Sequence, residues 1–275
     1  DARRRGGWPQ MCELFAVNAQ EPVVVNQLLT TFFSHSVNHP HGWGVAWRHS
    51  DGQVELHKGP ERAIDSPELS WLLGRTIMYP RLLAHIRNAT EGGVSYHNSH
   101  PFDGVDVSGV EWVMIHNGAI IHDDLLSGYD RWTEGETDSE RILMFLLDLI
   151  EEATLRVDRR LTFAERFDLL SRAINQLANG NLLNIILDDG EHLYVHTNTI
   201  EETLYGKQTQ GSVVLSTKPL DEGEWHPVPR SRLVAFKGGR VERMSMPHLN
   251  AVCDEEVLRF LSAGAPAKQS ARRVG

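Results

Sequence analysis

The sequence has few cysteines and no long apolar run. Of its 275 residues only two are cysteines, Cys12 and Cys253, and they form no Cys-x-x-Cys motif. Such low usage is typical of a reducing compartment, so we expect a cytoplasmic protein. No apolar stretch approaches the roughly 20 residues that a membrane-spanning helix needs, which predicts a protein without a membrane partner.

Positive charge is also scarce. The chain has 27 Lys and Arg against 37 Asp and Glu, a formal net charge of -10. A nucleic-acid-binding surface needs a basic face, so the sequence predicts no nucleic-acid partner. The apolar content of 41% and the charged content of 23% are ordinary for a globular protein that buries a normal core.

Histidine is abundant, but its arrangement does not indicate a metal site. The chain has 14 histidines, and two groups of them are close in sequence: His35, His39 and His41, and then His97 and His100. Neither group includes an acidic or thiol residue at a recognised ligand spacing. We therefore expect no metal ion and no other cofactor.

Both ends of the chain differ in composition from the middle. Residues 1–11 contain three arginines with glycine and proline, and lack the apolar centre of a signal peptide. We interpret them as a leader, a propeptide or a wrongly assigned start. Residues 262–275 are rich in Ala, Ser, Lys and Arg and are predicted to be a disordered tail. Residues 12–261 are then one domain.

The pattern of apolar residues predicts an α+β fold. Short helices are expected to begin at Glu21-Pro22 and at Ser66, and longer amphipathic helices at two capping boxes, Thr137–Glu140 and Thr162–Glu165. Strands are expected at 12–19, 45–47, 54–57, 82–87, 110–116, 182–187, 192–196, 213–217, 233–237 and 241–243. Two blocks of strands thus flank a pair of long helices.

A cysteine directly after a methionine is the most informative motif. If Met11 is removed, Cys12 carries a free α-amine beside its thiol. That amine has a reference pKa of roughly 8, so it can accept the thiol proton near neutral pH. Alone, Cys12 would be interpreted as a small buried residue of the first strand. Three later segments favour a nucleophile: AHIRNAT at 84–90, IHNG at 115–118 and GETDSE at 135–140.

In this order, with His100-Pro101 between the first and second, these segments resemble the class II glutamine amidotransferases. That family belongs to the N-terminal nucleophile (Ntn) hydrolases. Met-Cys-Glu-Leu at 11–14 and Gly-Trp-Gly at 42–44 are most similar to its stand-alone, YafJ-type members. The resemblance covers residue 12 to about residue 245. It implies a four-layer αββα sandwich, with two mostly antiparallel sheets between helix layers.

The resemblance also implies roles in catalysis. Cys12 would attack the side-chain amide carbon of glutamine, expel ammonia and leave a γ-glutamyl thioester for water to hydrolyse. Asn117 and Gly118 would donate N–H groups to the oxyanion that this attack creates. An Asn-Gly pair is also typical of a tight turn, which is the alternative interpretation at this position.

Four further residues would bind the substrate. The resemblance assigns Arg87 to the glutamine carboxylate, Asp138 to its ammonium group, and Thr90 and His100 to the pocket wall. Without the resemblance, Arg87 would be a surface residue at a strand end and Asp138 a carboxylate that complements a helix dipole. Residue 88 is Asn where ammonia-channelling relatives often have Trp.

Three functions remain open at this point. The first is hydrolysis of glutamine, in which the ammonia is either released by a plain hydrolase or accepted by a separate protein. A second alternative is hydrolysis of another γ-glutamyl amide, because the predicted residues contact only the glutamyl half of the substrate. A third is a non-catalytic partner subunit with the same fold, which would retain residues 1–11.

Overall fold

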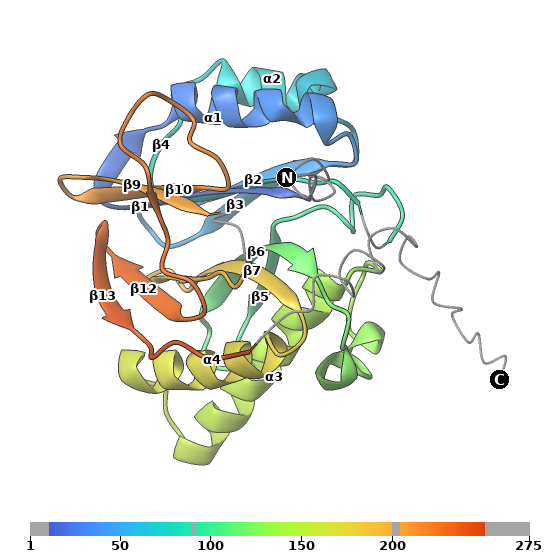
Figure 1. The fold of residues 1–275 in the computed structure, drawn as a ribbon, viewed down its shortest axis with the longest axis vertical. Helices are drawn as coiled ribbons and strands as arrows, with labels where there is room; N and C mark the ends of the chain where they lie inside the picture. Colours follow the sequence, from blue (N-terminus) through green and yellow to red (C-terminus); the bar gives the residue numbers. More distant parts are fainter. Residues whose placement is uncertain (1–10, 90–91, 200–203, 251–275) are drawn as a thin grey trace, which may run out of the picture.

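Two antiparallel sheets lie face to face at the centre of the molecule, and two helices cover the outer face of each (Figure 1). This computed structural model describes residues 11–89, 92–199 and 204–250. Most of the predicted leader, Thr90, Cys253 and the predicted tail lie outside the described residues. The four layers confirm the predicted αββα arrangement.

The first sheet carries the nucleophile candidate at one end of its central strand. Leu14 on β1 pairs with His85 on β4, which brings Cys12 to the end of β4 where Arg87 follows. The strand order is β11-β9-β10-β1-β4-β2-β3. The strands are β1 (Glu13–Val24), β2 (Trp43–Arg48), β3 (Val54–Gly59), β4 (Met78–Ile86), β9 (Tyr205–Thr209), β10 (Ser212–Ser216) and β11 (His226–Pro227).

The second sheet carries the predicted oxyanion residues on an inner strand. Asn117 pairs with Asn184 and Gly118 with Leu183, so both lie within the β6–β7 ladder. The strand order is β13-β12-β8-β7-β6-β5. The strands are β5 (Phe102–Val105), β6 (Glu111–Ala119), β7 (Leu182–Asp188), β8 (Leu193–His196), β12 (Leu233–Lys237) and β13 (Arg240–Met244).

Among residues 11–89, 92–199 and 204–250, four α-helices form the two outer layers, with short 3-10 turns between elements. In the described part of the chain, no helix is both long and apolar enough to cross a bilayer. The helices are α1 (Asn26–Ser34), α2 (Pro67–Leu73), α3 (Asp138–Val157) and α4 (Phe163–Leu177). The 3-10 turns are η1 (His35–Asn38), η2 (Ala63–Asp65), η3 (Asp124–Leu126) and η4 (Tyr129–Arg131).

The two predicted capping boxes differ in the structure. Thr162 and Glu165 form a complete box at the start of α4, in which each side chain binds the other residue's backbone N–H. At α3, Thr137 accepts the N–H of Glu140, but the Glu140 carboxylate accepts the N–H groups of residues 134 and 135, each at 2.8 Å. Glu140 therefore fixes the segment that leads into α3.

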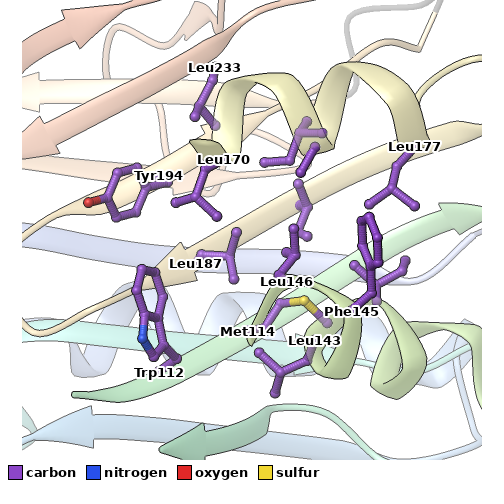
Figure 2. Packing of buried hydrophobic residues seen from close by; sticks show 14 of the residues in the cluster. Trp112, Met114, Leu143, Phe145, Leu146, Leu170, Leu177, Leu187, Tyr194 and Leu233 are labelled. Carbon is purple, nitrogen blue, oxygen red and sulfur yellow. The ribbon is translucent and has the colours of Figure 1, made fainter. Parts of the chain in front are cut away.

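Alternating side chains divide the apolar core into three clusters. Phe15 of β1 packs toward α1 and α2, whereas Leu14 and Ala16 pack between the sheets. On β6, Trp112 and Met114 face α3 and α4 while Val113 and Ile115 face the first sheet. Figure 2 shows the cluster under α3 and α4, where Leu143, Leu146, Leu170 and Leu177 pack on Met114 and Leu187.

Two sequence-based expectations are wrong. Glu21 and Pro22 do not begin a helix, because β1 continues through an irregularity between Asn18 and Val23 and pairs again with β4. Proline is tolerated there because a bulged position need not donate to the ladder. The tight turn proposed as an alternative for Asn117-Gly118 is also absent, since both residues are inside β6.

Candidate active site

Residues from separate segments line one small cavity of about 30 Å³. Five of the predicted site residues are among them, at the start of β1, after β4, just before β5, on β6 and in the first turn of α3: Cys12, Arg87, His100, Gly118 and Asp138. The structure thus brings together residues up to 126 positions apart (138 − 12). Thr90 lies outside the described residues.

Strand alternation explains why these side chains meet. Leu14 and Leu83 belong to the cluster between the sheets, so Cys12 and Arg87, an even number of residues away, share that face. On the facing sheet, Asn117 follows Val113 and Ile115 at the same period. The Asn117 side chain is therefore on the face of β6 that is directed toward the first sheet.

The Cys12 thiol is enclosed by the backbone of Asn88. Sγ lies 3.4 Å from the Asn88 carbonyl oxygen, to which it donates, and 3.3 Å from the Asn88 nitrogen, whose N–H it accepts. Burial raises the pKa of Cys12 to about 11, although the Asn88 N–H and the charge of Arg87 act in the opposite direction. With Met11 attached, the thiol is therefore protonated at neutral pH, and attack requires a nearby base.

Arg87 and Asp138 supply opposite charges on the wall of the cavity. Arg87 is 2% exposed and donates to the carbonyl oxygens of Gly93 at 2.9 Å and Gly92 at 3.2 Å. Burial lowers the pKa of Arg87. Asp138 is the first residue of α3, and its carboxylate accepts the hydroxyl of Ser139 at 3.2 Å. A zwitterionic amino acid matches this pair of charges.

Three buried histidines lie around the cavity, and sequence reasoning gave a role to only one of them. The rings of His85 and His100 stack with centroids 4.0 Å apart. Because the Ser139 hydroxyl donates to Asp138, His116 donates its Nδ1–H to Ser139 Oγ at 2.9 Å. Burial lowers the pKa of all three, to about 3 for His85, so they are neutral. The signal was available, because His85 and His116 stand inside the motifs that carry Arg87 and Asn117.

Five of the fourteen buried side-chain atoms that lack a hydrogen-bond partner in the described part of the chain lie around this cavity. Both ring nitrogens of His100, Nδ1 of His85, Nε2 of His116 and Oδ1 of Asn117 are buried and have no hydrogen-bond partner among the described residues. Buried polar atoms are normally satisfied, so such a group needs an explanation. A polar ligand in the cavity would supply partners for some of them.

Glycine is required at two positions beside the cavity. A Cβ at Gly118 would lie 2.0 Å from the Leu182 carbonyl oxygen and 2.6 Å from His116 Nε2. A Cβ at Gly44 would lie 2.1 Å from the carbonyl oxygen of His100. Trp43, between the two glycines of the Gly-Trp-Gly motif, is fully buried in the core under α1 instead.

The segment after Arg87 is tied to the segment before α3 by two side chains that sequence reasoning missed. Asn98 accepts the N–H of Glu136 at 2.7 Å and donates to the Gly93 carbonyl at 2.9 Å. Glu136 accepts the N–H of Gly93 at 3.1 Å. These contacts place the carbonyl groups that Arg87 binds, and a side chain that joins two loops leaves no periodic signal in sequence.

Comparisons of sequence agree with this geometry. A family model described as glutamine amidotransferases class-II matches residues 11–207. YafJ of Escherichia coli is 27% identical over 192 residues, covering 69% of this chain and 74% of YafJ. An uncharacterized protein of Methanocaldococcus jannaschii is 27% identical over 264 residues, covering 84% of this chain and 70% of that protein.

Solved structures share the fold at lower identity. A predicted glutamine amidotransferase from Pseudomonas aeruginosa superposes with a TM-score of 0.61 at 20% identity, over 84% of this chain and all of that one. Glutamine phosphoribosylpyrophosphate amidotransferase from B. subtilis gives 0.64 at 17% identity, over 88% of this chain and 51% of that one. The match of the family model over most of the chain, on this αββα fold, shows that the protein belongs to the class II glutamine amidotransferases.

Proposed function

We propose that this protein hydrolyses the side-chain amide of glutamine to glutamate and ammonia, with Cys12 as the nucleophile. The observation that carries the proposal is the shared cavity of Cys12, Arg87, His100, Gly118 and Asp138. A thiol, two opposite charges and a strand position without a side chain are the parts that this reaction on an amino acid requires.

Before the enzyme can act on glutamine, the residues that precede Cys12 are removed from the chain. The freed α-amine takes the thiol proton, which matters because burial raises the pKa of that thiol to about 11. Sγ then attacks the amide carbon, the amine proton passes to the leaving nitrogen, and ammonia departs. Water attacks the resulting γ-glutamyl thioester, which releases glutamate and restores the thiol.

Negative charge on the amide oxygen would be stabilised from the second sheet. The Asn117 side chain is on the face of β6 that is directed toward the first sheet, and its buried Oδ1 has no hydrogen-bond partner among the described residues. The Gly118 backbone is accessible from the cavity because it has no Cβ. We assign these two groups to the oxyanion, since fixed donors at a water-poor site are the largest source of stabilisation for such a charge.

The other end of the substrate would bind Arg87 and Asp138. The Arg87 guanidinium presents a planar fork that suits a carboxylate, and it now contacts backbone carbonyl oxygens that a carboxylate can replace. Asp138 would pair with the α-ammonium group. His100, and Thr90 by the resemblance of its motif, would form the pocket wall.

The test uses a chain that begins at Cys12 and compares three substrates. We expect kcat/KM to be highest for glutamine and low for asparagine, whose shorter side chain stops before Sγ. Acid-quenched samples should contain a γ-glutamyl adduct on Cys12 by peptide mass. A γ-glutamyl anilide that far outperforms glutamine would instead support hydrolysis of another γ-glutamyl amide.

A second measurement addresses the leader. The intact mass of active protein from its own host should begin at Cys12. Full activity in a protein that still has residues 1–11 would contradict the proposal, because no α-amine would be present. A chain that retains residues 1–11, binds glutamine and hydrolyses nothing would be the matched negative control.

A further inference from the structure

A carboxylate and two histidines lie directly behind the nucleophile, on the side of β1 that faces the helix layer. Glu13, next to Cys12, is almost fully buried and binds Nδ1 of His35 at 2.7 Å through Oε2. Its other oxygen binds the Lys218 ammonium and is 3.8 Å from Nε2 of His39. None of these groups lines the catalytic cavity, yet one of them contacts the peptide bond that precedes Cys12.

His39 is that group. It follows η1, is 1% exposed, and places Nε2 3.0 Å from the carbonyl oxygen of Met11. That oxygen is separated by only two covalent bonds from the nitrogen that becomes the α-amine of Cys12. The other ring nitrogen, Nδ1, is 3.0 Å from the carbonyl oxygen of His35.

The contact at Nδ1 fixes the tautomer. A carbonyl oxygen can only accept, so Nδ1 carries a hydrogen, and the neutral ring then has its lone pair at Nε2. The carbonyl oxygen of Met11 can also only accept, so Nε2 can bind it only in a doubly protonated ring. With the peptide intact, the two contacts together fit a doubly protonated His39 beside the Glu13 carboxylate, whereas a neutral ring would present its Nε2 lone pair to the Met11 oxygen. After residue 11 is removed, the same nitrogen faces an amine, which can donate.

We propose that His39 is the positioning residue of the α-amine: its Nε2 accepts one amine N–H and thereby directs the amine lone pair toward the Cys12 thiol. The proposal rests on the proposed function in one respect, that Cys12 becomes the first residue. His39 does not touch the substrate, and it acts by holding the base. Glu13 and His35 in turn hold His39, through the contact at Nδ1 and the adjacent carboxylate.

Other charged groups surround this arrangement and remain the same in every variant of the test. On the helix side they are Glu13, His35 and Lys218. On the cavity side, Arg87 and Asp138 act on the Cys12 thiol, and His41 and His85 are within electrostatic reach of His39. Two amide substitutions at position 39 test the two ring nitrogens one at a time, because each keeps a polar atom near only one of them. Neither substitution changes any of these surrounding groups.

The test uses His39→Asn and His39→Gln in the chain that begins at Cys12. Asn keeps a donor near the place of Nδ1 and loses the acceptor at Nε2, whereas Gln keeps an acceptor near Nε2. We expect His39→Asn to lower kcat for glutamine and the rate of Cys12 alkylation by iodoacetamide at pH 7 by about tenfold, the effect of one lost hydrogen bond. KM should stay near wild type, and His39→Gln should recover most of both rates.

Two controls make the result specific. His192→Gln replaces another buried histidine, which stacks on Phe163 outside the cavity, and should leave both rates unchanged whatever its stability. In the chain that retains residues 1–11, His39→Asn should not change the alkylation rate, because no α-amine is present. Melting temperatures identify any variant that fails to fold. If His39→Asn does not fold, the rates of His39→Gln are compared with those of wild type instead.

Three outcomes would overturn the proposal. His39→Asn could affect the rates no more than His192→Gln, His39→Gln could be as impaired as His39→Asn, or the effect could be equal with residues 1–11 attached. Alkylation needs no glutamine. If wild type alkylates rapidly with the expected His39 dependence but hydrolyses no amide, the proposed substrate is wrong and the positioning role stands.

Discussion

Two buried polar clusters of this protein differ in how completely they are paired. In the Asp189 cluster, under α4, the carboxylate is fully paired: it accepts Tyr194 at 2.8 Å and the N–H groups of Glu191 and His192, and it forms an ion pair with Arg166 Nε at 3.1 Å, although Arg166 Nε and His192 Nδ1 make no hydrogen bond among the described residues. In the Cys12 cluster (Cys12, His85, His100, His116 and Asn117) five buried atoms have no partner among the described residues. The buried carboxylate that holds α4 to the second sheet is therefore fully paired, whereas the neutral polar groups around the cavity are not.

Replacing the nucleophile should give the largest effect on activity and almost none on the fold. In a chain that begins at position 12, we expect Cys12→Ala to reduce glutamine hydrolysis by about 10⁴-fold or more, because the attacking atom is gone. Calorimetric binding of glutamine should persist, since Arg87 and Asp138 are intact. A variant that turns over glutamine at the wild-type rate would move the nucleophile elsewhere.

Breaking the paired cluster should do the reverse. Arg166→Met leaves Asp189 buried without its cation, which should cost about 3–5 kcal/mol of unfolding free energy. Urea unfolding measures that loss. At a temperature where the variant is folded, kcat/KM for glutamine should equal that of wild type. A variant with wild-type stability and lower kcat/KM would erase the distinction between the two clusters.

The charged pair at the cavity should behave as ligand-binding groups. Arg87→Lys keeps the charge and loses the fork, and Asp138→Asn loses the charge but still fits a first helical turn. Each should cost about 1.5–3 kcal/mol of substrate binding, or one to two decades in kcat/KM. Differential scanning calorimetry should show little change in either. Lost stability with unchanged kcat/KM would make both charges structural.

Acid should reveal the neutral histidines through stability. An unfolded histidine titrates near 6.5, whereas burial lowers the pKa of folded His85 to about 3. Between these values only the unfolded state binds the proton, so unfolding free energy falls by about 1.4 kcal/mol per pH unit for each such histidine as pH decreases. His85→Gln should remove that amount from the slope measured between pH 6 and pH 4.

A matched control lies outside the site. Burial also lowers the pKa of His196 to about 3, so His196→Gln should flatten the slope equally while glutamine hydrolysis is retained. An unchanged slope in His85→Gln would mean that folded His85 already carries a proton near neutral pH.

Local rules predicted the elements that depend on nearby residues. The N-caps Ser66, Thr137 and Thr162 begin helices as predicted, because a capping side chain binds a backbone group only three residues away. The short strands β5, β9 and β11 were not predicted. β5 pairs with β6 and β9 with β10 in hairpins, and β11 pairs with β9, but their own residues carry no alternation that distinguishes them from loops.

The candidate site divides in the same way. Motifs and their resemblance to a family named Cys12, Arg87, His100, Gly118 and Asp138, which line one cavity. They also named Asn117-Gly118 but allowed a turn there, because the preference of Asn-Gly for turns is local and β7 supplies the strand partner of Asn117 from 67 positions away (184 − 117). The roles of Asn98, Glu136 and His39 depend on contacts with residues far away in the sequence, so no sequence pattern predicted them.

The apolar layer between the two sheets has a consequence for the chemistry at its end. Cys12 belongs to one sheet and Asn117 and Gly118 to the other, and small or branched side chains such as Ala16, Ala46, Val113 and Ile115 fill the space between. The thickness of that layer sets the distance between the Cys12 sulfur, the proposed nucleophile, and the groups that we assign to the oxyanion. The geometry of the proposed reaction therefore depends on the size of apolar side chains in the core, although none of those four residues lines the cavity.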